Sequence, residues 1–213
     1  MKFKKIIFPI TLIILALFPI MASIDGQFTL LIFSIFVLMW LLRPILKPVI
    51  KKITLPLFFK LLLLGIIFAI ITEYLVFLDA GIGITGESGL FSQNLLFNLI
   101  LAMGIYVSLI IVWYFLLKKY KFNLVQVFLL AGIWGVVIEQ DFAVLLSFNL
   151  LAYLYIFAVY GSFVSIPFML TRDDFDKIKR KENKVKYVVA FFSQFIAYVI
   201  GFLWMALLMN LFG

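Results

Sequence analysis

The sequence predicts an all-α integral membrane protein, a polytopic bundle of about seven transmembrane helices. Hydrophobic residues make up 66% of the 213 positions, and this is about the amount that seven spans of roughly 20 residues require. Charged residues make up only 13%, about half of their share in a typical water-soluble domain. We therefore expect a single transmembrane domain over residues 1–213, without a separate soluble domain.

The positions of the basic residues order the spans. All 18 Lys and Arg residues fall in segments that one seven-span path places on the same side, and the loops on the other side carry only acids. Because basic loops stay in the cytoplasm, we expect a cytoplasmic N-terminus and an outside C-terminus. The expected spans are residues 6–24, 28–42, 57–78, 91–117, 122–138, 142–170 and 187–210.

The first span follows three lysines within the first five residues and is read as a signal anchor. A Lys-rich start before an apolar run is also typical of a cleaved signal peptide. Ile20 and Met21, however, are poor matches to the small residues that precede a cleavage site, and the next span begins almost at once, at Phe28.

The middle of the chain is divided by prolines and charges. Pro44, Pro48 and Pro56 lie in the basic loop after the second span, where we expect them to prevent a continuous helix. Lys60 lies close enough to the inner end of the third span for its ammonium to reach the headgroups. The segment 79–92 is expected to be an outer loop.

The last three spans alternate between an acidic outer turn and a basic inner loop. The outer turn is Glu139-Gln140-Asp141. The sixth span, 142–170, is longer than a perpendicular crossing needs, which indicates tilt. Residues 171–186 form a basic cytoplasmic loop, with a short helix expected to begin after Thr171. Its basic side chains are expected to contact anionic lipids: Lys177, Lys179, Arg180, Lys181, Lys184 and Lys186.

The chain contains no Cys and no His. Disulfides, a thiolate nucleophile, an imidazole base and His-ligated haem or zinc are therefore excluded. We expect no cofactor, no metal site and no nucleic-acid partner. The acids Asp173, Asp174 and Asp176 do not have the spacing of a magnesium-binding motif. Any proton-handling group must be Asp, Glu, Tyr or Lys.

Glu73 is the most informative polar residue. It lies about five residues before the outer end of its span, which is roughly 8 Å below that surface. A carboxylate at this depth is costly and usually has a partner or a task. A Glu that hydrogen-bonds to a neighbouring helix for structural reasons is the alternative interpretation.

Four more residues complete the candidate polar site. Glu139 and Asp141 are expected near the depth of Glu73, and Asn94 and Asn98 are four residues apart and thus on one helical face. Neighbouring carboxylates can bind a cation, share a proton or act as acid and base. A solvated turn explains the first pair equally well, and interhelical hydrogen bonding explains the amides.

Three functions remain open. The first is a small transporter or channel-like protein that binds a cation, proton or small solute at this outward-facing site. The second is a cofactor-free membrane enzyme in which Glu73 and Glu139 act as acid and base on a lipid or isoprenoid. The third is a non-catalytic assembly subunit. The excess of Lys over Arg favours a prokaryotic cytoplasmic membrane.

Overall fold

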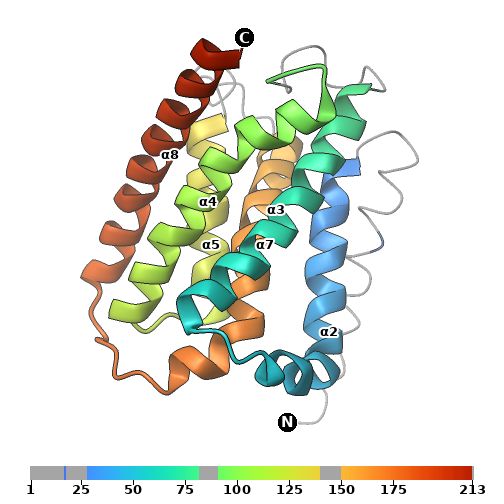
Figure 1. Cartoon of the computed structure of the whole chain (residues 1–213). Helices are drawn as coiled ribbons and strands as arrows, with labels where there is room; N and C mark the ends of the chain where they lie inside the picture. The colour runs from blue at the N-terminus through green and yellow to red at the C-terminus, as the bar shows by residue number, and fades with distance from the viewer. Residues whose placement is uncertain (1–16, 18–27, 82–90, 140–149, 213) are drawn as a thin grey trace.

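The computed structural model is an all-helical bundle (Figure 1). It describes Leu17 and residues 28–81, 91–139 and 150–212, so the first expected span and Asp141 lie outside the described residues. The helices within these ranges are η1 (Phe28–Leu30), α2 (Leu31–Lys52), α3 (Leu57–Gly81), α4 (Leu95–Lys119), α5 (Leu124–Glu139), α7 (Leu150–Asp176) and α8 (Val185–Phe212).

Five helices in the described ranges are long and apolar enough to cross a membrane: η1 with α2, α3, α4, α7 and α8. The prediction of a helical membrane bundle is confirmed. The number of such spans in the described part of the chain is five and not seven, because the first expected span is not described there and α5 is a shorter apolar helix. The chain has the helices of a multi-pass membrane protein.

α7 lies in the middle of the bundle. It packs against α2, α3 and α5, and it also contacts α4. α8 packs mainly on α4 and forms one edge of the molecule (Figure 1). α3 packs on α4, whereas α3 and α5 do not contact each other within the described residues.

Large apolar side chains cover the faces of the helices that point away from the core. On α8, Phe192, Ile196 and Leu203 are 62%, 61% and 65% exposed. Water-soluble monomers rarely expose apolar patches of this extent. Lipid is the solvent that suits these faces.

α5 and α7 approach each other closely because glycines line both helices. A Cβ on Gly132 would lie 2.8 Å from the backbone oxygen of Phe157, and a Cβ on Gly161 would lie 2.9 Å from that of Phe128. Small residues at such positions let membrane helices pack backbone to backbone.

The prediction that prolines prevent a continuous helix is wrong for Pro44 and Pro48, whereas Pro56 lies in the break between α2 and α3. α2 continues through Pro44 and Pro48 to Lys52, and in Figure 1 its last turns run across the base of the bundle. A proline inside a helix removes one hydrogen bond and clashes with the preceding turn, which bends a helix that other contacts hold in place. The bent part keeps Lys47 and Lys51 within ion-pair distance of α7.

Two other helices extend beyond their expected ends. α3 continues to Gly81, so Asp79 is helical and does not belong to a loop. α7 continues to Asp176, so Thr171 lies inside the helix, where its hydroxyl donates to the carbonyl of Pro167 at 2.8 Å. The first six residues of the expected 171–186 loop are therefore helical.

The two basic loops are joined to each other. Lys181, in the α7–α8 loop, forms a bridge with Tyr120, in the α4–α5 loop. Its backbone N–H donates to the carbonyl of Lys119 at 3.0 Å, and its carbonyl accepts from the N–H of Lys121 at 2.9 Å.

Candidate functional site

The two ends of the bundle differ in charge. Every Lys and Arg within the described ranges lies in or next to the α2–α3, α4–α5 or α7–α8 connections, at the lower end in Figure 1, which we call the basic end. The opposite end, which we call the acidic end, carries Asp79 and Glu139, with Glu73 below it on α3.

Glu73 is buried between α3 and α4 and is only 3% exposed. The side-chain amide of Asn98 donates to its Oε1 at 2.6 Å, and the hydroxyl of Tyr106 donates to its Oε2 at 3.0 Å. Each carboxyl oxygen thus accepts from a neutral donor on α4. The nearest basic residue along α3 is Lys60, about 20 Å away along the helix axis.

The direction of the Asn98 amide is determined by two backbone groups. Its Oδ1 accepts from the N–H of Phe91 at 2.8 Å and from the N–H of Ser92 at 3.2 Å. Because the oxygen side is occupied, the NH₂ side faces Glu73. Asn98 is completely buried, so this donor has no freedom to turn to solvent.

Tyr106 is a site residue that the sequence analysis missed. Its ring packs edge-on against Phe163 of α7, with ring centroids 4.8 Å apart, and this contact holds the hydroxyl near Glu73. Tyr106 lies two turns beyond Asn98 on α4. The available signal was the helical period, which puts it near the same face.

Asp79 is a second buried carboxylate and is 2% exposed. It accepts from the backbone N–H groups of Phe28 and Thr29, from the Thr29 hydroxyl, and from the Tyr155 hydroxyl at 2.9 Å. The first N–H groups of a helix lack partners, and the helix dipole favours a negative charge beside them. Asp79 therefore caps η1 and α2 and ties them to α3 and α7.

The structure separates the other candidate residues from Glu73. Asn94 is the exposed N-cap residue of α4, and its side chain accepts from the N–H of Phe97 at 3.1 Å. Glu139 is the last residue of α5, a helix that does not contact α3 within the described ranges. Helix packing thus gives no support to a pair of Glu73 and Glu139.

α7 carries further buried polar groups. Ser162 and Ser165 are both 0% exposed, and their hydroxyls have no hydrogen-bond partner among the described residues. They lie about two and three turns beyond Tyr155, towards the basic end. Buried hydroxyls without a partner are uncommon, so these two mark a polar position within the apolar interior.

The three aspartates at the basic end are neutralised by basic side chains. Asp173 lies 2.7–3.5 Å from three cations of α2, and Asp174 lies 2.9 Å from Lys60. The remaining ion pairs are Asp174 with Lys177, and Asp176 with Arg172 and Arg180. These partners give the acids a structural role in joining α7 to α2 and α3.

The basic residues expected to contact lipid fall into two groups. Arg180 and Lys186 have side chains that are 4% and 2% exposed. The other four are exposed at the surface of the basic end: Lys177, Lys179, Lys181 and Lys184.

Lys186 is a buried cation inside the basic end. Its ammonium donates to the carbonyl of Lys121 at 2.6 Å and to Glu182 at 3.0 Å, and it lies 5.2 Å from the ring centroid of Phe122. The hydrogen bond from Lys186 holds the pKa of Glu182 below its usual range. This lysine therefore links the two basic loops and is not available to a headgroup.

No family model, curated protein or solved structure matches this chain. The chemistry of Glu73 and its neighbours must therefore carry the functional argument. A buried carboxyl with an amide and a phenol beside it can take up a proton, or it can supply oxygen ligands to a small cation.

Proposed function

We propose that this chain is a small transport protein of a cytoplasmic membrane, in which Glu73 binds the transported proton or small cation. The observation that carries the proposal is the burial of this carboxylate between two membrane helices, with Asn98 and Tyr106 as its donors. Ionisable residues at such positions are costly and typically belong to ion or proton pathways.

The charge distribution indicates from which side of the membrane Glu73 is reached. Basic loops remain in the cytoplasm, so the basic end is the cytoplasmic end, and Glu73 is loaded from the outside. In this proposal the chain crosses the membrane seven times, with the apolar segment 6–24 as the first span, the N-terminus inside and the C-terminus outside.

The two donors of Glu73 respond differently when the carboxyl takes up a proton. A protonated carboxyl donates one hydrogen bond. The Tyr106 hydroxyl can rotate to accept it, whereas the Asn98 amide cannot, because its oxygen is held by Phe91 and Ser92. Protonation of Glu73 therefore reverses the hydrogen bond with the Tyr106 hydroxyl and leaves the hydrogen bond from the Asn98 amide in place.

Ser162 and Ser165 support a route from Glu73 towards the basic end. Their hydroxyls lie inside the bundle on α7, the helix that packs against α3. Hydroxyl groups both donate and accept, so they can hold a water or a cation in transit.

An enzyme that uses Glu73 on a lipid is less well supported. A described apolar pocket lies between α2 and α5, and no carboxylate lines it. Glu73, in contrast, lies between α3 and α4. A lipid in the pocket would have neither an acid nor a base beside it.

Flux into vesicles tests the proposal. The purified chain is reconstituted into liposomes, H⁺, Na⁺ and K⁺ gradients are imposed in turn, and each gradient is followed with an enclosed dye that is sensitive to that ion. We expect the wild-type chain to dissipate at least one gradient faster than empty vesicles, and Glu73→Gln to fall to the level of empty vesicles. Wild-type vesicles that hold all three gradients would contradict the proposal and favour an assembly subunit.

α4 offers a matched pair of control variants. Asn98→Ala removes the donor to Glu73, and Asn94→Ala removes an exposed cap from the same helix. We expect the first change to lower the flux and the second to leave it unchanged once the amounts of folded protein are equal. Equal flux in both variants would remove Asn98 from the site.

A further inference from the structure

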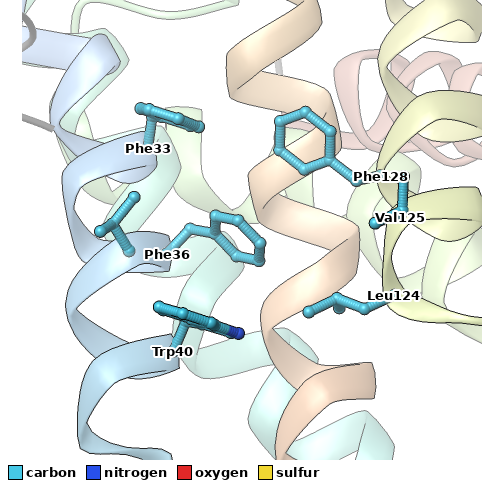
Figure 2. A pocket seen from close by; sticks show the side chains of 7 residues that line it. Phe33, Phe36, Trp40, Leu124, Val125 and Phe128 are labelled. Atoms are coloured by element: carbon cyan, nitrogen blue, oxygen red, sulfur yellow. The ribbon is translucent and has the colours of Figure 1, made fainter. Parts of the chain in front are cut away.

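A groove of apolar side chains lies between α2 and α5 (Figure 2). Figure 2 shows Phe33, Phe36 and Trp40 of α2 facing Leu124 and Phe128 of α5, with α7 between the two helices. Val37 and Val125 complete the lining, and the cavity volume is about 230 Å³. α2 and α5 do not contact each other within the described ranges except through such side chains.

The same face of α2 continues from this groove into a row of cations. Arg43, Lys47 and Lys51 follow Trp40 at intervals of three or four residues, which puts all four side chains on one side of the helix. The groove therefore has an apolar part within the bundle and a basic part at the basic end. Trp40 lies where the apolar part meets the basic part, and tryptophans in membrane proteins are frequent at the depth of the headgroups.

The basic part carries more positive charge than its partner neutralises. Arg43, Lys47 and Lys51 lie 3.4, 2.7 and 3.5 Å from Asp173, and this single carboxylate is shared by all three. The side chains of Lys47 and Lys51 remain 44% and 54% exposed. Lys121, just before the start of α5, is also exposed. Both walls of the groove thus end in positive charge.

We propose that this groove binds one anionic phospholipid of the bilayer. An acyl chain lies among the aromatic side chains, and the phosphate meets Lys47, Lys51 and Arg43. A lipid whose headgroup has no net negative charge has the same acyl chain, but it lacks the negative charge that complements the row of cations on α2. The site is separate from Glu73 and does not depend on the proposed transport.

The contacts across the groove favour an extended chain over a helix. The ring centroids of Phe33 and Phe36 lie 6.1 and 5.3 Å from that of Phe128, so the side chains of α2 and α5 already meet. A helix with a diameter of about 10 Å would have to separate them. An extended acyl chain is thinner than a helix and can lie along these rings.

Trp40 makes the site measurable. Of the four tryptophans, Trp113 and Trp134 are buried and Trp204 is 42% exposed. In a Trp204→Phe background, brominated acyl chains quench Trp40 by contact. The probes are phosphatidylcholine vesicles that contain a small fraction of brominated phosphatidylglycerol or of brominated phosphatidylcholine with the same chains. We expect phosphatidylglycerol to associate roughly tenfold more strongly, because its charge meets two partly neutralised lysines.

Two double variants with the same change of charge separate this site from general attraction. Lys47→Gln/Lys51→Gln retains the pair of Arg43 with Asp173, and we expect it to abolish the preference for phosphatidylglycerol. Lys179→Gln/Lys184→Gln removes two exposed cations elsewhere on the basic end and should retain it. Equal effects of the two variants, or no preference in the parent, would overturn the proposal.

Filling the groove provides a test that does not depend on charge. Val125→Phe places a larger side chain in the lining, and Val188→Phe makes the same change on the exposed face of α8. We expect the first to reduce quenching by both lipids and the second to leave it unchanged. Unchanged quenching in Val125→Phe would contradict the site. So would an unquenched parent that forms dimers in native mass spectrometry, because a second copy would then cover the groove.

Discussion

Asp79 and Glu73 are buried carboxylates on the same helix with different sets of donors. Asp79 accepts from two backbone N–H groups at the start of a helix and from the hydroxyls of Thr29 and Tyr155. Glu73 accepts from the side chains of Asn98 and Tyr106 across a helix interface. The donors of Asp79 therefore include backbone groups that fix the start of η1, whereas the two donors of Glu73 are side chains of α4.

Asp79→Asn should destabilise the protein by about 2–3 kcal/mol, because the new NH₂ group faces donors and leaves one or more of them without an acceptor. Thermal unfolding in detergent micelles measures the loss. Asp176→Asn is the control: its side chain is 49% exposed, and the Asn oxygen can still accept from Arg172 and Arg180, so we expect a smaller change of about 1 kcal/mol. Equal losses would show that Asp79 does not act as a cap.

Asn98→Ala should cost about 2–4 kcal/mol of unfolding free energy, because two buried N–H groups and the Glu73 carboxyl lose a partner together. Asn94→Ala removes one exposed helix cap and should cost about 1 kcal/mol. Chemical unfolding of both variants under one set of conditions gives the comparison. A larger loss in Asn94→Ala would contradict the assignment of their roles.

At the level of single residues, the sequence selected Glu73 but did not predict all of its hydrogen-bond partners. The depth of Glu73 in an apolar run was enough to select it. One of its two partners was predicted: Asn98 was expected nearby. Tyr106 shares the helical period of Asn98, but Tyr also packs in apolar surroundings, so the period alone did not select it as a hydrogen-bond donor. Asn94 was expected beside Asn98, yet the helix begins at Leu95, and this single boundary turns Asn94 into a cap.

Among the elements, the α5–α7 contact depends most on side-chain size. Gly132 faces the backbone of Phe157, and a backbone atom cannot rotate away as a side chain can. The short distance between α5 and α7 therefore depends on the absence of side chains on the glycines.

Gly132→Ala should destabilise the protein by about 1–3 kcal/mol, because its methyl group forces the two backbones apart. The neighbouring Ile133 is 47% exposed towards the surroundings of the bundle, so Ile133→Ala should change the unfolding free energy by about 0.5 kcal/mol or less. Thermal unfolding of the two variants tests this. A tolerated Gly132→Ala would mean that the helices are not held at this distance.

The existence of the helices was predicted better than their ends. Apolar length alone predicted α3, α4, α7 and α8, since a membrane requires about 20 apolar residues whatever they contact. The ends depend on distant partners. α2 passes Pro44 and Pro48 while its cations pair with Asp173, and α7 extends into acids that are neutralised by α2 and α3. Such partners are invisible in a local stretch of sequence.

For the whole molecule, the two ends differ in charge. Since the described helices alternate in direction, one end collects every basic connection within the described ranges. We predict from this difference that the basic end lies in the cytoplasm, because the packing of the helices is the same in either orientation.

Single-cysteine labelling tests the orientation, because the chain has no cysteine of its own. In intact cells we expect an impermeant maleimide to label Gln93→Cys, at the acidic end, and to label Lys184→Cys, at the basic end, only after the membrane is opened. Both positions are exposed, so access and not burial decides the result. Reversed labelling would mean that Glu73 is loaded from the cytoplasm.

The bridge between Tyr120 and Lys181 has a consequence for biogenesis. The ribosome releases the α4–α5 loop long before the α7–α8 loop, yet each needs the other for its backbone hydrogen bonds. Lys186, which seals the same junction, arrives later still. A nascent chain that has inserted its first helices therefore keeps this end open to proteases and chaperones until the last helix hairpin is complete.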